Sequence, residues 1–347
     1  MKRAFAQIDL AKLTANLQDY RQKIAKCTEI MGIVKADAYG HGAVTVAKKL
    51  SASGVKYFGV AWLSEAEELR LNGITAPILI LSEPEPKYIS KIIELDVVQT
   101  VYDYDFVAQL AKAADKKIKV HIKIDTGMNR IGVKPEKLTE LLQKIKILKN
   151  IEVEGVFTHL ACLDDSARKQ LKLFEQCLTE VKQIYPNIKY VHAASSAVAL
   201  HFPEAHYNMV RLGIGLYRGV LTLKSRVMAV KTIQAGEAVS YGAAFVASAP
   251  VRIATISIGY ADGLSRLLSD RGFVLIRGRK YQLRGNICMD MCIAQVDDTV
   301  MLGDEVVLIG RQGEAEITAQ ELADLTGTID YEIMCGIGKR VPREFME

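Results

Sequence analysis

Eight short apolar runs, most of them separated by amphipathic helical patterns, fill the chain up to about residue 215 and limit what it can fold into. The runs occupy residues 30–35, 57–61, 77–81, 97–101, 118–125, 153–159, 190–193 and 207–213. Helix-like segments such as 42–54, 64–73 and 167–185 lie between them, several starting near Ser or Asp and ending near Gly or Asn. This alternation predicts an α/β fold, specifically a (β/α)8 barrel, with a doubly wound sheet as the weaker alternative.

The pattern changes after Gly219. Segments 224–233, 252–259, 272–278 and 304–310 are typical of strands separated by turn residues, and only 317–327 has a helical pattern. A chain of 347 residues is longer than one core usually supports, apart from barrels. We therefore predict a barrel domain over 10–218 and a mostly-β domain over 219–347.

Composition excludes several classes of protein. The net charge of +5 comes from basic residues scattered along the chain, which argues against nucleic acid as a partner. Six cysteines without a CxxC pair fit a reducing compartment. Neither a signal peptide nor a membrane-spanning run is recognisable. We expect a cytoplasmic protein with no membrane partner and no metal site; the absence of GxGxxG after an early strand counts against a dinucleotide fold.

Ionisable side chains are predicted to gather at one end of the barrel. The first run, 30–34, is apolar but ends at Lys35, and a loop with two glycines, a tyrosine and a histidine is expected next. A lysine at the end of a buried strand is costly unless it is paired, solvated or chemically used. Barrel enzymes work at the C-terminal ends of their strands. Those ends also carry Lys123, Asp125, Arg130, His159, Ser195, Ser196 and Arg211.

The last two strand ends resemble a phosphate site. Loops after strands seven and eight of a barrel commonly bind phosphate through backbone N–H groups and small hydroxyls. Here they read HAASSA and RLGIG, which supply Ser195, Ser196, Gly213 and Ile214. A phosphate site together with Lys35 suggests pyridoxal 5'-phosphate (PLP) bound to that lysine as a Schiff base.

An ordered set of motifs carries a family resemblance. VKADAYGHG, HIKIDTGMNRIG, THLACLDD, HAASSA, NMVRLGIGLY, VSYGAAF, SIGYADG, GNICMD and RVPR run from about residue 8 to residue 343. In order and spacing this set resembles the PLP-dependent alanine racemases. The resemblance implies a barrel followed by a β domain that the N-terminal strand, within 1–9, joins. It also implies a head-to-tail homodimer whose active sites take residues from both chains.

The resemblance also assigns the chemistry. Lys35 resembles the lysine that binds the cofactor and acts as one catalytic base, and Tyr241 resembles the opposite base, contributed by the partner chain. Two groups on opposite faces of a planar carbanion exchange its proton better than one that must swing. The implied reaction interconverts L- and D-alanine through an external aldimine and supplies D-alanine for cell-wall peptidoglycan.

Further residues resemble cofactor and substrate contacts. Arg211 resembles the partner of the pyridine nitrogen, and Arg130 a contact to the cofactor phenolate and the substrate carboxylate. His159 and Arg211 are implied to tune Tyr241, and Met289 to offer its backbone N–H to the substrate carboxylate. The implied phosphate contacts are Tyr39, Ser196, Gly213 and Ile214. Each side chain also has a purely structural alternative: surface lysine, packed tyrosine, core histidine, or arginine in an ion pair or at a helix entry.

Lys123 resembles a lysine that many family members carry carbamylated, which can hold Arg130; a plain buried lysine paired with Asp125 is the alternative. Tyr260, Asp164 and Arg266 resemble residues of the entrance corridor, although solvated surface groups would look the same. Two positions depart from the family pattern. Asn286 replaces a corridor arginine, and Lys339 stands where some members have a tyrosine, so the preference among small amino-acid substrates stays open.

Three rival functions fit parts of this pattern. A serine or broad-specificity racemase on the same scaffold would explain Lys339. Amino-acid decarboxylases share the two-domain fold but usually bind phosphate with a more glycine-rich run than SSA and LGIG. A non-catalytic PLP-binding protein is essentially a barrel alone, so the β-rich region after Gly219, with Tyr241 and Met289, argues against it.

Overall fold

A computed structural model describes residues 3–82 and 85–347. The chain divides into two compact units, which are described separately. One unit comprises Thr14–Ala38 and Ala43–Leu216, and the other comprises Met1–Leu13, Tyr39–Gly42 and Tyr217–Glu347. The domain boundaries expected from sequence, 10–218 and 219–347, stay a prediction.

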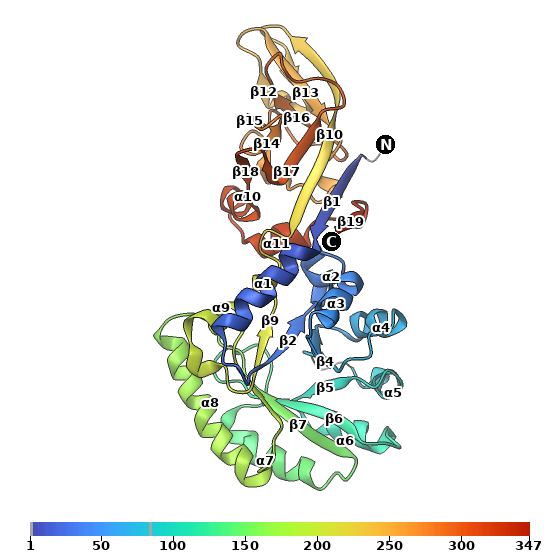
Figure 1. Cartoon of the computed structure of the whole chain (residues 1–347), viewed down its shortest axis with the longest axis vertical. Coiled ribbons are helices and arrows are strands. Elements are labelled where there is room, and N and C mark those ends of the chain that lie inside the picture. The colour runs from blue at the N-terminus through green and yellow to red at the C-terminus, as the bar shows by residue number, and fades with distance from the viewer. Residues whose placement is uncertain (1–2, 83–84) are drawn as a thin grey trace. The chain divides into compact units, whose positions relative to one another are not determined.

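The unit that contains Thr14–Ala38 and Ala43–Leu216 is a barrel of parallel strands (Figure 1). Its strand order is β8-β7-β6-β5-β4-β3-β2-β9, and an isolated parallel bridge between Ser195 and Arg211 brings the two ends together. All eight predicted strands are present, so the barrel is confirmed over the doubly wound sheet. Their bounds are β2 Glu29–Ile33, β3 Tyr57–Val60, β4 Ile78–Ile80, β5 Val98–Val101, β6 Ile118–Lys123, β7 Ile151–Phe157, β8 Tyr190–His192 and β9 Met209–Leu212.

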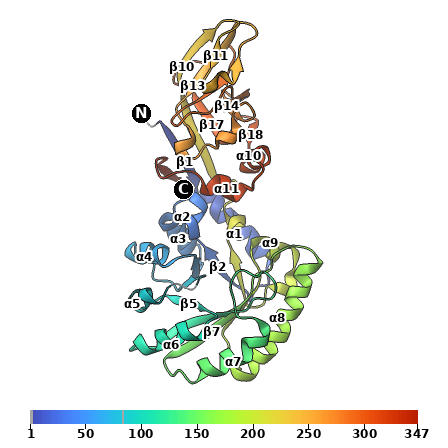
Figure 2. The same cartoon turned by 180° about the vertical axis from the view of Figure 1, so that it is seen from behind.

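Helices lie outside these strands, as the view from behind also shows (Figure 2). They form where one face is apolar: in α8, Leu171, Phe174 and Leu178 recur at helical spacing and are buried. Asp103 and Asp164 cap α6 and α8 through their side chains, and Pro135 opens α7. The bounds are α1 Leu10–Lys23, α3 Ala43–Ala52, α4 Leu63–Leu71, α5 Ile89–Glu94, α6 Tyr104–Ala113, α7 Pro135–Lys146, α8 Asp165–Ile184 and α9 Ser196–His201.

The other unit is mostly β, as predicted. Strand β1 (Ala4–Asp9) pairs antiparallel with β10 (Leu221–Ile233) and parallel with β19 (Arg343–Met346), so the N-terminal strand joins this sheet. The long β10 also pairs with β13 and β17. The remaining strands are β11 Ala238–Val239, β12 Phe245–Val246, β13 Val251–Ile256, β14 Phe273–Ile276, β15 Arg279–Gln282, β16 Cys292–Gln295, β17 Glu305–Gln312 and β18 Ala315–Ile317.

The expectation of a single helix in this region was wrong. Helix α10 (Ala319–Thr326) occupies the predicted segment, but α11 (Asp330–Cys335) follows it directly. A helix of six residues is too short to show a reliable 3.6-residue period in sequence. No helix in the described part of the chain is both long and apolar enough to cross a membrane.

Candidate active site

Strand β2 delivers Lys35 to the C-terminal end of the barrel. Ile30, Met31, Ile33 and Val34 are buried, and the N–H of Val34 still bonds to the neighbouring strand. Lys35 is the first residue beyond this apolar segment, and its side chain is only partly buried. The apolar run therefore fixes the backbone on which the amine is carried.

The loop expected after Lys35 is instead a short helical turn, α2 (Lys35–Gly40), and the prediction was wrong. The φ angles of Ala36, Asp37, Ala38 and Tyr39 are 51°, 53°, 53° and 55°. These values are left-handed, a conformation that costs an L-residue roughly 1–2 kcal/mol. Four consecutive residues of this kind were not recognisable because their side chains carry no left-handed signature. Strain of this kind persists only where the surroundings hold it, commonly at functional sites.

The carboxylate of Glu65 holds the start of this turn. Its Oε1 accepts a hydrogen bond from the N–H of Ala36 at 2.6 Å. Its Oε2 accepts from the N–H groups of Ala61 and Trp62 at 2.7 and 3.0 Å, at the entry of α4. One side chain thus ties the residue after Lys35 to the end of β3 and the start of α4.

A cationic cluster lies at the C-terminal ends of the barrel strands. Arg211 of β9 is buried; its Nη2 donates to His159 Nδ1 at 3.1 Å and to the carbonyl oxygens of Thr158 and Ala193, both at 2.9 Å. In the part of the chain that the structure describes, its hydrogen bonds go to imidazole nitrogens and backbone carbonyl oxygens. Burial and the nearby charge of Arg130 lower the pKa of Arg211 to about 9, which still leaves the guanidinium charged at neutral pH.

The same charges act on His159 and Lys123. Burial and then Arg211, Lys123, Arg130 and Lys35 lower the pKa of His159 to about 2, so this imidazole is neutral. Its Nδ1 accepts a hydrogen bond from Arg211, which places its proton on Nε2. Burial, followed by Arg211 and Arg130, lowers the pKa of Lys123 to about 7. The structure therefore places five residues predicted from sequence close enough for their charges to interact: Lys35, Lys123, Arg130, His159 and Arg211.

The alternative of a buried lysine paired with Asp125 stays a prediction: the charge of Asp125 acts on Lys123 and raises its pKa, against burial, Arg211 and Arg130. The Asp125 carboxylate binds Lys134 at 2.8 Å and accepts from the N–H groups of Gly127 and Asn129. The amine of Lys123 lies over the ring of Phe157, 4.8 Å from its centroid. Asp125 thus binds Lys134 directly and acts on Lys123 through its charge.

The two loops predicted to bind phosphate meet at one hydroxyl. Ser196 Oγ accepts from the N–H groups of Gly213 and Gly215, at 2.8 and 3.3 Å. Ile214 begins a 3-10 turn (Ile214–Leu216) directly beside them. A Cβ built on Gly215 would lie 2.0 Å from the hydroxyl of Tyr20, so only glycine fits there. Small residues and backbone N–H groups therefore converge near Arg211, which forms an isolated parallel β-bridge with Ser195.

Two further predicted residues of the barrel unit, Arg130 and Asp164, are exposed. The charge of Arg130 acts on Lys123, His159 and Arg211 as described. Asp164, expected in the entrance corridor, caps α8 by accepting from the N–H of Ser166 at 2.9 Å. The corridor role of Asp164 stays a prediction.

In the β unit, several predicted residues are exposed. The side chain of Tyr241 is 75% exposed, and its backbone carbonyl accepts a hydrogen bond from the Asn286 amide at 2.7 Å. Met289 and Tyr260 are also exposed, at 53% and 43%. Lys339 is exposed, and Arg266 begins a 3-10 turn (Arg266–Leu268).

Tyr39 belongs to the same unit as these residues. It is buried, with its ring 5.1 Å from that of Tyr217 and 6.0 Å from that of Tyr331. Burial, with Tyr331 and Cys335, raises the pKa of Tyr39, so its hydroxyl keeps its proton and can donate a hydrogen bond.

Sequence reasoning missed three residues of this site. His192 accepts a hydrogen bond from Arg211, and Phe157 lies under both Lys123 and Arg211. Both belong to strands that had been recognised, and their alternation with outward residues was the available signal. Glu65 had no signal, because its role depends on a turn that is distant in sequence.

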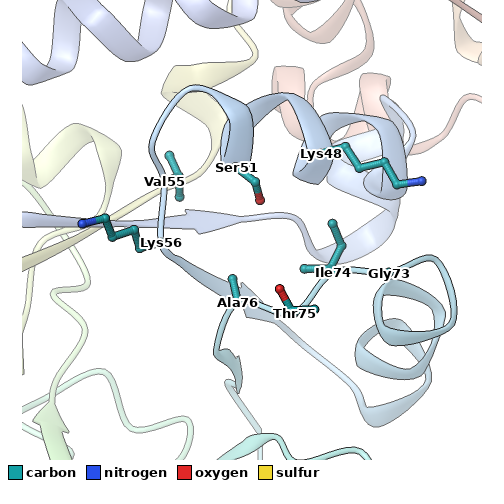
Figure 3. Close-up of a pocket in the computed structure, with 8 residues that line it drawn as sticks. All are labelled: Lys48, Ser51, Val55, Lys56, Gly73, Ile74, Thr75 and Ala76. Atoms are coloured by element: carbon teal, nitrogen blue, oxygen red, sulfur yellow. The ribbon is translucent and has the colours of Figure 1, made fainter.

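A separate pocket lies at the opposite ends of β3 and β4 (Figure 3). It has a volume of about 440 Å³ and is lined by residues that precede these strands and by the end of α3. Lys48 and Lys56 point away from each other, and away from its centre. The N-terminal face of a barrel generally serves stability, and we assign this pocket no role in the site.

A parallel barrel with a lysine on a strained turn and a cluster of cationic side chains is the kind of site that holds an anionic small molecule next to an amine. A protein-family model described as "Alanine racemase, N-terminal domain" matches residues 8–220, and one described as "Alanine racemase, C-terminal domain" matches residues 220–345. The chain belongs to the alanine racemase family.

Individual relatives agree over the full length. An alanine racemase of Carboxydothermus hydrogenoformans is 41% identical, with 100% of both chains covered. The crystal structure of alanine racemase from Bacillus anthracis with bound L-Ala-P has a TM-score of 0.95 at 35% identity and covers 100% of this chain and 96% of that one. Alanine racemase from Bartonella henselae, described with covalently bound pyridoxal phosphate, has a TM-score of 0.90 at 30% identity, with 100% of both chains covered.

Proposed function

We propose that this protein is a PLP-dependent alanine racemase that interconverts L- and D-alanine and supplies D-alanine for peptidoglycan. The observation that carries the proposal is Lys35, at the end of a buried strand, beside a cationic cluster that contains Arg211. Family membership over residues 8–345 supports it.

The residues of the barrel unit fit PLP. The cofactor carries a phosphate and a phenolate, and the positive charges of Arg130 and Arg211 near Lys35 suit such an anion. Lys35 would hold it covalently, Arg211 would bind the pyridine nitrogen, and Arg130 would contact the phenolate. The N–H groups and hydroxyl gathered at Ser196, Gly213 and Ile214 would meet the phosphate. Tyr39, which belongs to the other unit, is proposed as a phosphate donor from the family resemblance.

Two bases would move the proton of the substrate. PLP, when bound, supplies the electron sink that makes a Cα–H bond of an amino acid acidic. The amine of Lys35 takes or returns the proton at the α carbon on one face, and the phenol of Tyr241 from the partner chain acts on the other. Arg211 stays protonated and donates, so it withholds a full proton from the pyridine nitrogen and restrains side reactions.

Three groups would orient the substrate and the bases. Arg130 and the backbone N–H of Met289 bind the substrate carboxylate, which fixes the α hydrogen between the two bases. His159, neutral and bound to Arg211, keeps an Nε2–H with which to hold the Tyr241 oxygen. We further propose that Tyr260, Asp164, Arg266, Asn286 and Lys339 line the approach and set substrate preference.

Lys123 is proposed to be carbamylated. Carbamate formation requires a neutral amine, and the lowered pKa of Lys123, about 7, makes that form available near neutral pH. The product is an anion that would offset neighbouring cations and orient Arg130. Growth or incubation with 13C-bicarbonate should give a carbonyl resonance that Lys123→Ala lacks; the same spectrum for both proteins would refute the assignment.

The decisive test of activity is optical. Purified protein mixed with PLP and L-alanine should lose optical rotation until both enantiomers are equal, whereas Lys35→Ala should not. Stable rotation at any enzyme concentration would refute the proposal. Carbon dioxide release instead would identify a decarboxylase, and PLP binding without turnover would identify a non-catalytic binding protein.

A serine or broad-specificity racemase is the second candidate, because exposed Lys339 and the Asn286 substitution alter charge along the proposed approach. Comparing kcat/KM for alanine, serine, lysine and glutamate distinguishes the two. A clear preference for any substrate other than alanine would favour this candidate.

We propose that the protein is a cytoplasmic homodimer whose sites are shared between chains. Tyr241 and Met289 are exposed in the single chain and therefore available to a partner. Mixing inactive Lys35→Ala and Tyr241→Phe chains tests this directly, since each mixed dimer would contain one intact site. Recovery of about a quarter of the wild-type activity is expected for random exchange. No recovery after demonstrated exchange would contradict shared sites.

A further inference from the structure

A continuous line of buried polar side chains runs through the barrel interior away from Arg211. Arg211 Nη1 lies 2.8 Å from His192 Nδ1, and His192 Nε2 lies 2.8 Å from His121 Nδ1. His121 Nε2 is 3.3 Å from the hydroxyl of Tyr57 and 3.6 Å from Glu154 Oε2. The Tyr57 hydroxyl donates to the same Glu154 oxygen at 3.2 Å. All five residues are buried.

The line ends at the other end of the barrel. Glu154 is the first residue of the buried half of β7, and its second oxygen, Oε1, lies 3.3 Å from Lys119 Nζ and 3.4 Å from Lys189 Nζ. Both lysine side chains are exposed, whereas the glutamate side chain is 3% exposed. Strands β6, β7 and β8 are neighbours in the sheet, so the three strands supply His121, Glu154 and His192 to one side of the interior.

Packing fixes the two imidazole rings. A Cβ built on Gly155 would lie 2.5 Å from His121 Cε1, so the missing side chain makes room for this ring. The ring of His192 stacks on Phe157 with centroids 4.6 Å apart and an interplanar angle of 7°. Neither ring can turn without displacing its neighbours, which leaves the position of the ring proton as the variable.

Arg211 and Glu154, at the two ends of this line, favour the same direction of donation along it, from Arg211 towards Glu154. Guanidinium has donors and no acceptor, so the hydrogen bond to Arg211 forms only when His192 accepts at Nδ1 and carries its proton on Nε2. It then donates to His121 Nδ1, and the His121 proton lies on Nε2, facing Tyr57 and Glu154. Burial and Arg211 lower the pKa of both histidines, which are neutral. Burial opposes ionisation of Glu154, yet His121 and Lys119 lower its pKa to about 2, so it only accepts.

We propose that Glu154 is a positioning residue for Arg211: its carboxylate selects the Nε2–H tautomers of His121 and His192, so that His192 presents a lone pair to the guanidinium. With the opposite tautomers, two N–H groups would face each other at Arg211, and a buried hydrogen bond would be lost. The inference rests on the proposed function, because Arg211 is there the partner of the cofactor pyridine nitrogen. It extends the site to a residue at the far end of the barrel.

Glu154→Gln tests whether the carboxylate selects one set of histidine tautomers, because glutamine has nearly the same size but can both donate and accept. A glutamine can accept at its oxygen or donate from its nitrogen, so it permits the reversed line as well as the original one. Lys189→Gln is the matched control. It removes a charge that binds the other Glu154 oxygen but leaves the line from Glu154 to Arg211 intact.

Ring-15N histidine NMR of the holoenzyme reads the tautomers directly, with signals assigned by single histidine replacements. In the wild type and in Lys189→Gln, both His121 and His192 should be protonated on Nε2 alone. In Glu154→Gln, a fraction of His192 should carry the proton on Nδ1. A wild-type His192 protonated on Nδ1 would overturn the proposal, even if Glu154→Gln does not fold.

Kinetics gives the second measurement. In Glu154→Gln, kcat for racemisation should fall about tenfold, the effect of one lost buried hydrogen bond, with KM little changed. Lys189→Gln should keep wild-type kcat. Unchanged tautomers and unchanged kcat in a folded Glu154→Gln protein would refute the role of Glu154. An inactive wild type with the expected tautomers would instead refute racemase function alone, so the two failures are distinguishable.

Discussion

Replacing Glu65 by glutamine should loosen the turn that carries Lys35. The carboxylate uses both oxygens, one for Ala36 and one for Ala61 and Trp62. An amide has a single accepting oxygen, so glutamine can satisfy the start of α4 or the N–H of Ala36, but not both. Its NH2 group would then face a backbone donor. We expect the bond to Ala36 to be lost, because the other oxygen also caps a helix.

The magnitude follows from the number and kind of bonds. A hydrogen bond to a charged group contributes about 1.5–3 kcal/mol, and the lower value suits a half-buried carboxylate such as Glu65. The left-handed residues of α2 carry a conformational cost of roughly 1–2 kcal/mol each, so the turn depends on such contacts. Loss of about 1.5 kcal/mol corresponds to a fall in Tm of about 3–6 °C for a domain of this size.

Lys35 is the residue next to Ala36, so the effect on turnover should exceed the effect on stability. A displacement of a reacting group by about 1 Å can cost about a hundredfold in rate. We therefore expect kcat for racemisation to fall by about tenfold to a hundredfold in Glu65→Gln. Calorimetry and initial-rate kinetics on the holoenzyme measure the two effects.

Glu68→Gln is the control, because it removes an exposed carboxylate from the same helix. It should keep wild-type Tm and kcat. If Glu65→Gln also kept both values, the carboxylate would not hold the turn and the reasoning would be refuted. A lowered Tm with unchanged kcat would confine Glu65 to capping α4.

Three further outcomes are expected. Lys35→Ala should lose the visible absorbance of the bound cofactor together with turnover; a yellow variant with normal rates would contradict the role of this amine. Tyr241→Phe should slow proton removal from one alanine enantiomer far more than from the other in single-turnover isotope exchange, and equal slowing would count against opposed bases. The pKa of Lys123 is lowered from 10.5 to about 7, so unfolding takes up a proton between these values and stability should rise with pH across that window. With carbon dioxide and bicarbonate excluded, so that the amine of Lys123 is not carbamylated, denaturant titrations of Lys123→Met at several pH values should show this slope reduced; an unchanged slope would refute the lowered pKa.

The sequence by itself determined the barrel and the end of it that carries the chemistry. Apolar runs and helical periods depend on residues close together in the chain, and all eight runs became parallel strands. Because parallel strands end on the same side, Lys35, Lys123, His159 and Arg211 could be placed together from their positions in those runs. The β-rich region after Gly219 could likewise be recognised from local sequence patterns alone.

The tertiary structure decided how these side chains are held. Glu65 binds the start of the left-handed turn after Lys35, and Asp125 forms an ion pair with Lys134. Such partners come from different strands and helices, so no local period reports them. The line of hydrogen bonds from Arg211 to Glu154 is the strongest case, since its direction exists only once strands β6 to β9 are side by side. Local patterns select the elements, whereas charge, tautomer and strain are set by contacts that folding creates.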